Sequence, residues 1–180
     1  MKKIFYLLAI ISLTQLTGCI IFNTVSYEVN LNEDGTGTAT VFIDDVNTDA
    51  VTAETIEEEV NNILQHGLKS QEFINDMKAE GKNVIYRNAV VENNKLNIIV
   101  KYEFDNVNNV EGMQYESPYY FLTIPLTDSI ISTNGQISKT KDYQRIIWDK
   151  SIRTLKFKMF SDDTNRDGLT SLEKFYKKED

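Results

Sequence analysis

Few of the side chains that commonly perform catalysis occur in this sequence of 180 residues. It contains one histidine, His66, and one cysteine, Cys19. No serine stands in the pattern of a nucleophile elbow, and no stretch matches a glycine-rich phosphate loop. Adjacent carboxylates at 44–45 and 57–59 point in different directions on a strand or helix, so they do not converge on one substrate. The sequence predicts that the protein is not an enzyme; an enzyme whose carboxylates meet only in the fold is the alternative.

Oxygen-bearing side chains recur at alternate positions within residues 163–173, ahead of Gly168. This pattern resembles the opening of an EF-hand-type loop, which wraps a calcium ion in oxygen ligands. The twelfth loop position is Lys174, and the acid stands one residue early at Glu173. The alternative is an Asp-Gly turn followed by a short helix that Thr170 and Glu173 cap. The predicted calcium ligands are Asp163, Asn165, Asp167, Leu169 and Glu173.

The N-terminal residues follow the order of a secretory signal. Lys2 and Lys3 precede the apolar run 4–13, and residues 16–19 then read Leu-Thr-Gly-Cys. The apolar run is shorter than the roughly 20 residues that span a bilayer. Residues 16–19 resemble the lipobox of bacterial lipoproteins.

That resemblance implies removal of residues 1–18 as a signal peptide. Cys19 would then be the first mature residue and would carry a diacylglycerol, with further acylation, such as palmitate, on its amine. Each buried methylene contributes about 0.8 kcal/mol, so two or three acyl chains hold a protein firmly. The implied location is the cell envelope, with a lipid anchor in a membrane. Because Ile20 and not aspartate follows the cysteine, the outer membrane facing the periplasm is favoured in a Gram-negative organism.

Composition limits the remaining chain to one acidic domain. Removal of residues 1–18 takes away two lysines, so the net charge changes from −8 to −10. This charge argues against nucleic acid as a partner. Without a second cysteine, the chain forms no internal disulfide. We predict a single domain over 19–160 and a polar tail with a short helix over 161–180.

One segment of this acidic chain has a net positive charge. Residues 139–158 carry a net charge of +5, which leaves −15 for the rest of the mature chain. A basic surface on a tethered acidic domain suits lipid headgroups or an acidic partner, whereas lysines that protect a strand edge are the alternative. The basic residues are Lys139, Lys141, Arg145, Lys150, Arg153, Lys156 and Lys158.

Hydrophobic periodicity predicts the fold class. Residues 25–31 and 36–43 form a predicted hairpin, and residues 96–104 alternate as a half-buried strand. Spacings of three to five predict two helices that end near Gly67 and Gly81. Further strands are expected at 83–91, 119–126, 143–148 and 154–160. This order predicts an α+β fold with a mainly antiparallel sheet of about six to eight strands and two or three helices on one face, a two-layer sandwich.

The start of the mature chain has a second resemblance. Cys19 leads into the strand Tyr27-Glu28-Val29-Asn30-Leu31 and the turn Asp34-Gly35-Thr36-Gly37-Thr38. This opening is similar to that of the LppM-type lipoprotein domain. The resemblance is confined to the first hairpin. It implies an α/β envelope domain that associates with lipid and has no catalytic residues.

Together these features predict a membrane-anchored envelope lipoprotein that acts as a non-catalytic binding or accessory module for a partner protein or lipid. A calcium-dependent structural or adhesion module that acts through residues 163–173 is the alternative. Because Cys19 lies so near the first strand, we expect the first hairpin close to the membrane and the basic segment 139–158 facing it.

Overall fold

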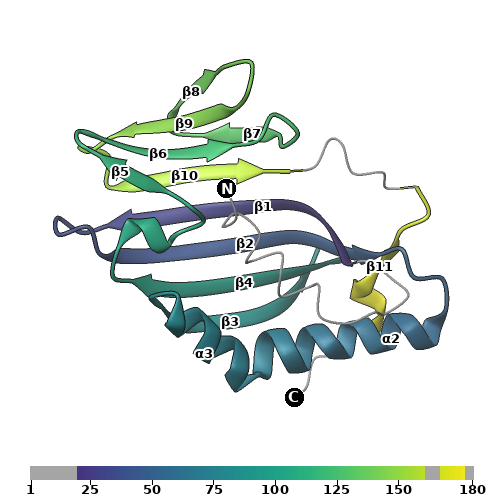
Figure 1. Ribbon diagram of the computed structural model, residues 1–180. Helices are drawn as coiled ribbons and strands as arrows, with labels where there is room; N and C mark the ends of the chain where they lie inside the picture. Colours follow the sequence, from purple (N-terminus) through teal and green to yellow (C-terminus); the bar gives the residue numbers. More distant parts are fainter. Residues whose placement is uncertain (1–19, 161–166, 177–180) are drawn as a thin grey trace.

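Two antiparallel sheets and a helical layer form the part of the chain that the computed structural model describes, residues 20–160 and 167–176 (Figure 1). The larger sheet consists of β1 (Ile20–Leu31), β2 (Gly37–Thr48), β3 (Lys82–Glu92), β4 (Lys95–Phe104), β7 (Ile130–Thr133), β10 (Thr154–Met159) and β11 (Thr170–Ser171). Its order is β3-β4-β2-β1-β10-β7, and β11 pairs with β2. The smaller sheet consists of β5 (Gln114–Glu116), β6 (Tyr119–Ile124), β8 (Gln136–Lys139) and β9 (Gln144–Asp149), in the order β5-β6-β9-β8.

The first hairpin is longer than its alternation pattern predicts, because β1 already begins at Ile20. Its turn forms where the sequence places Asp-Gly. Gly35 has a φ of 84°, and the Asp34 carboxylate accepts hydrogen bonds from the Thr36 backbone N–H and hydroxyl. Glycine adopts this left-handed conformation without steric cost, so the turn is encoded locally.

The helical layer consists of α2 (Ala53–Asn62), a π-helix (Ile63–Lys69) and α3 (Gln71–Ala79). The Thr52 hydroxyl caps α2 by accepting from the Thr55 N–H, and Ser70 caps α3. The first predicted helix continues past Gly67 as the π-helix. The Arg87 guanidinium donates to the carbonyls of Gly67 and Ser70 and so satisfies backbone groups at its end.

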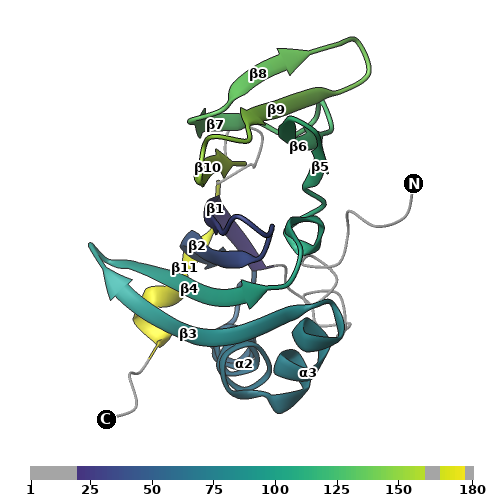
Figure 2. The ribbon, with the colours of Figure 1, turned by 90° about the vertical axis from the view of Figure 1, so that its left-hand side faces the viewer.

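The main core lies on one face of the larger sheet. Tyr27 stacks on Phe157 at 4.6 Å between ring centroids, and Trp148 from the smaller sheet packs on Phe157 at 5.8 Å. A second core joins α2 to β2, β3 and β4 through Val46, Leu96 and other residues. The helices and the smaller sheet therefore cover different parts of the same face, and no other layer of the described residues covers the opposite face of the larger sheet (Figure 2).

The mainly antiparallel α+β prediction is confirmed, but the prediction of a single sheet in a two-layer sandwich is wrong. Within the described residues the chain passes between the two sheets four times: from β4 to β5, from β6 to β7, from β7 to β8 and from β9 to β10. Gly135 permits the crossing from β7 to β8, because a Cβ there would lie 2.7 Å from both Ile146 Cγ2 and Trp148 Nε1. Local periodicity predicts strands but not which distant strand each one pairs with, so this division was missed.

The end of the chain packs on the domain. Thr170 and Ser171 pair with β2, and Leu172 is fully buried at the start of the 3₁₀ helix Leu172–Phe175. Ser171, and not Thr170, caps this helix, because the Ser171 hydroxyl accepts a hydrogen bond from the Glu173 N–H.

Candidate functional site

A groove of about 530 Å³ lies on the open face of the larger sheet, over β1, β2 and β10. Antiparallel register places Ser26 opposite Lys158 and Glu28 opposite Lys156 across β1 and β10. Phe42 on β2 lies opposite Ser26 on the other side of β1 and supplies an apolar floor. The groove therefore combines the Phe42 ring with hydroxyl groups and charged side chains from β1, β2, β7 and β10.

A cross-strand ion pair stands in this groove. Lys156 Nζ lies 2.8 Å from Glu28 Oε2, and this contact lowers the pKa of the Glu28 carboxyl. Both side chains are about half exposed, so water screens the pair and its contribution to stability is small. Lys158 adds a positive charge beside the neutralised pair, so the groove carries a net positive charge.

Asn134, after the end of β7, forms a rigid wall of the groove. Its side-chain oxygen accepts hydrogen bonds from the Lys156 backbone N–H and from Trp148 Nε1, both at 2.8 Å. Its side-chain amide donates to the Thr154 carbonyl at 2.8 Å. The same side chain thus ties the groove to β10 and to the buried indole of the main core.

The structure separates the seven predicted basic residues. Lys156 and Lys158 meet in the groove. Arg153 is next to the β9–β10 turn, 3.8 Å from Glu33. Arg145 lies on the smaller sheet, where its guanidinium stacks 4.4 Å from the Phe121 ring centroid. The remaining members are Lys139 in β8, Lys141 in the following turn and Lys150 in the β9–β10 turn. The basic segment is therefore a feature of the sequence and not a single surface.

The structure describes only part of the predicted calcium loop. Asp163 and Asn165 lie outside the described residues, as do Cys19 and the predicted signal peptide 1–18. Gly168 has a φ of 78°, in keeping with a tight turn between Asp167 and Leu169. Within 20–160 and 167–176, no three histidine, cysteine, aspartate or glutamate side chains come together in a metal-binding arrangement. Glu173 lies in the terminal 3₁₀ helix, where its N–H donates to the Ser171 hydroxyl.

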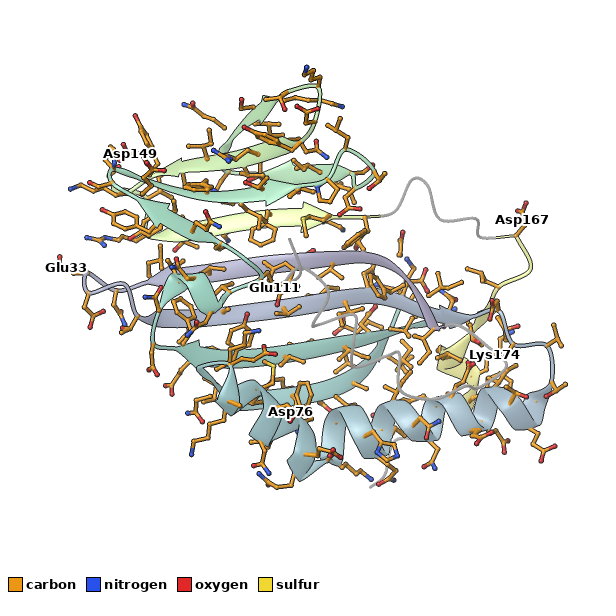
Figure 3. The ribbon with its side chains drawn as sticks, in the orientation of Figure 1. Glu33, Asp76, Glu111, Asp149, Asp167 and Lys174 are labelled. Carbon is orange, nitrogen blue, oxygen red and sulfur yellow. The ribbon has the colours of Figure 1, made fainter. Side chains whose placement is uncertain are left out.

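The structure also contains a buried polar cluster that the sequence did not predict. It consists of Glu111, Lys82, Tyr27 and Tyr102. Glu111 has a φ of 47°, in the loop that leads from the larger sheet to the smaller one, near the centre of Figure 3. Burial raises the pKa of its carboxyl, against the opposing effect of Lys82, whose Nζ lies 4.0 Å away. Burial, with the nearby Glu111 charge, also raises the pKa of Tyr27 well above its usual value. The hydroxyl of Tyr102 is buried without a hydrogen-bond partner.

This cluster connects segments that are distant in sequence, so no local pattern reveals it. Lys82 Nζ also lies 2.8 Å from Glu80 Oε2, at the junction of α3 and β3. The cluster therefore places the Glu111 side chain beside residues of β1, β3 and β4.

The chain matches no known family, and no curated protein matches it. Within the described residues, no helix has the length and apolar character needed to cross a membrane.

Proposed function

We propose that this chain is a lipoprotein of the bacterial cell envelope, anchored to a membrane through a lipidated Cys19. Its mature domain acts as a non-catalytic binding or accessory module for a partner protein or lipid. In a Gram-negative organism its place is the outer membrane, facing the periplasm.

The observation that carries this proposal is that β1 both follows the predicted anchor and lines the groove. This strand begins at Ile20, directly after the cysteine of the lipobox-like sequence, and its central residues Ser26 and Glu28 line the groove. A binding groove on the strand that leaves the anchor keeps any partner near the membrane surface. The scarcity of catalytic side chains in the sequence supports a binding role rather than a chemical one.

The side chains of the groove indicate the chemical class of partner that it binds. Phe42 offers an apolar contact, and Lys158 offers a positive charge that the Glu28–Lys156 pair does not offset. A ligand with an apolar part next to a carboxylate or phosphate matches both features, and an acidic protein segment or a lipid headgroup has this combination.

Anchoring is tested by the substitution Cys19→Ser in the producing cell. The variant is expected in the soluble envelope fraction without added lipid mass, whereas the wild type is recovered with membranes. Recovery of both proteins from membranes in equal amounts contradicts the anchor.

Binding is tested by capture of partners with the native lipidated protein, followed by mass spectrometry of bound proteins and lipids. Lys158→Glu and Phe42→Ala are expected to lose the specific partner. Lys141→Glu is the matched control, because Lys141 is exposed and lies outside the groove. Loss of the same partner in the control, or its retention in both groove variants, rules out the groove.

A calcium-dependent structural or adhesion module is the second candidate. It is favoured by the positive φ of Gly168, at the loop position where a calcium loop turns sharply. Calorimetric titration of the mature domain decides it: heat that disappears in Asp167→Asn supports the candidate, and absence of heat at millimolar calcium rejects it.

A further inference from the structure

The position of Ile20 determines which end of the domain lies nearest the anchor. Ile20 begins β1 and pairs with Thr48 at the end of β2. Cys19 is bonded to Ile20, and consecutive Cα atoms are about 3.8 Å apart. The residue that would carry lipid is therefore joined directly to this end of the larger sheet.

An exposed apolar side chain stands at the same end. The Ala50 N–H donates to the Thr48 hydroxyl, which turns the chain after β2, and Ala50 itself is buried. The next residue, Val51, is 92 % exposed, the highest value for a large hydrophobic residue among those that the structure describes. Thr52 then caps α2, so the backbone on both sides of Val51 is held in place.

The first turn lies far from this end. A strand rises about 3.3 Å per residue, so Leu31 lies about 36 Å from Ile20 along β1. In Figure 3, Glu33 marks that distant end, and Asp167 lies at the opposite side of the molecule. The open end of the first hairpin is therefore the end that is joined to residue 19, and the turn is the distant end.

We propose that the end of the larger sheet formed by Ile20, Thr48 and Val51 rests on the lipid bilayer, with the Val51 side chain entering its interfacial region. This inference rests on the proposed lipidation of Cys19, which brings the bilayer to Ile20. It replaces the orientation in which the basic segment faces the membrane.

The charges of this end distinguish a membrane contact through Val51 from one through the basic segment 139–158. Asp49 and Glu54 flank Val51, so anionic lipid repels the end that we place on the bilayer. Lys158 pairs with Ser26, about 20 Å from Ile20 along β1, and Arg153 lies beside Leu31, at the far end of the strand. A contact through Val51 weakens when anionic lipid is added, whereas a contact through the basic segment strengthens.

The test uses the lipidated protein in vesicles with a fluorescent label on one introduced cysteine. Lipid blocks Cys19, so the label reacts only with Val51→Cys, Glu33→Cys or Lys141→Cys. The vesicles are phosphatidylcholine with a spin-labelled headgroup lipid as quencher. We expect quenching several-fold stronger at position 51 than at 33 or 141, and weaker at 51 when phosphatidylglycerol is added. Equal or stronger quenching at 33 or 141 overturns the inference.

A second arm separates the orientation from the lipidation. A hexahistidine tag in place of Cys19, held on nickel-chelating lipid, anchors the same three labelled variants without acyl chains. The same ranking is expected, and a different ranking overturns the orientation. Mass spectrometry of the native N-terminal peptide without lipid on Cys19 overturns the proposed function, and this inference with it, whatever the ranking.

Discussion

Asn134→Ala is expected to loosen the connection between the two sheets. The substitution removes the oxygen that accepts from Trp148 Nε1 and the Lys156 N–H, and the amide that donates to Thr154. Trp148 is fully buried, so its indole N–H loses its partner where water does not reach it. A buried donor without a partner costs about 1–3 kcal/mol, whereas water replaces the contacts made at exposed residues. We expect a loss of about 2–3 kcal/mol in the free energy of unfolding.

Asn134→Asp is the matched control. It keeps an oxygen that accepts from Trp148 and Lys156 and replaces the amide that donates to Thr154 with an oxygen that cannot donate, at an exposed position that water reaches, so we expect a loss of about 1 kcal/mol. Urea unfolding measures both variants. Trp148 is the only tryptophan of the chain, so its fluorescence reports on the junction and circular dichroism on the whole sheet. A loss of less than about 0.5 kcal/mol in Asn134→Ala, or equal losses in both variants, refutes this reasoning.

Three further changes test other parts of the fold. Burial raises the pKa of Glu111, so its ionised form disfavours the folded state. This cost is absent below the ordinary glutamate pKa, grows as the pH rises from that value to the raised folded pKa, and is constant above it. Glu111→Gln is therefore expected to raise the urea midpoint at pH 7 and not at pH 3.5, and an equal effect at both pH values contradicts this. Gly135→Ala is expected to cost about 1–3 kcal/mol in urea unfolding through overpacking against Trp148, whereas Gly67→Ala, with no neighbouring atom within 4 Å, stays near wild type. Ser70→Ala removes the cap of α3 and is expected to cost about 1 kcal/mol in thermal unfolding; an unchanged melting temperature argues against the cap.

The candidate site shows the limit of local patterns. The alternation of Lys156 and Lys158 on one strand face was readable, because alternate residues of a strand share a face. Their neighbours Ser26, Glu28 and Phe42 were not, because they come from strands more than a hundred residues earlier. Register between distant strands depends on packing across the whole sheet, so the groove and its ion pair exist only in the tertiary structure.

Other elements were predictable because their causes are local. The Asp34-Gly35 turn and the caps at Thr52 and Ser70 form from side chains that bond to a backbone only two or three residues away. The polar cluster around Glu111 has no such signature, since Lys82 and Tyr102 reach it from separate strands.

The sequence by itself determined the strand and helix content, the acidic charge and the lipobox-like N-terminus, because composition, period and short motifs are properties of neighbouring residues. Only the tertiary structure decided that the strands divide into two sheets, that the basic segment is dispersed, and that Ile20 and Val51 share one end of the molecule. Each of these depends on contacts between residues far apart in the chain. Such contacts form through burial and shape complementarity, which no local pattern records.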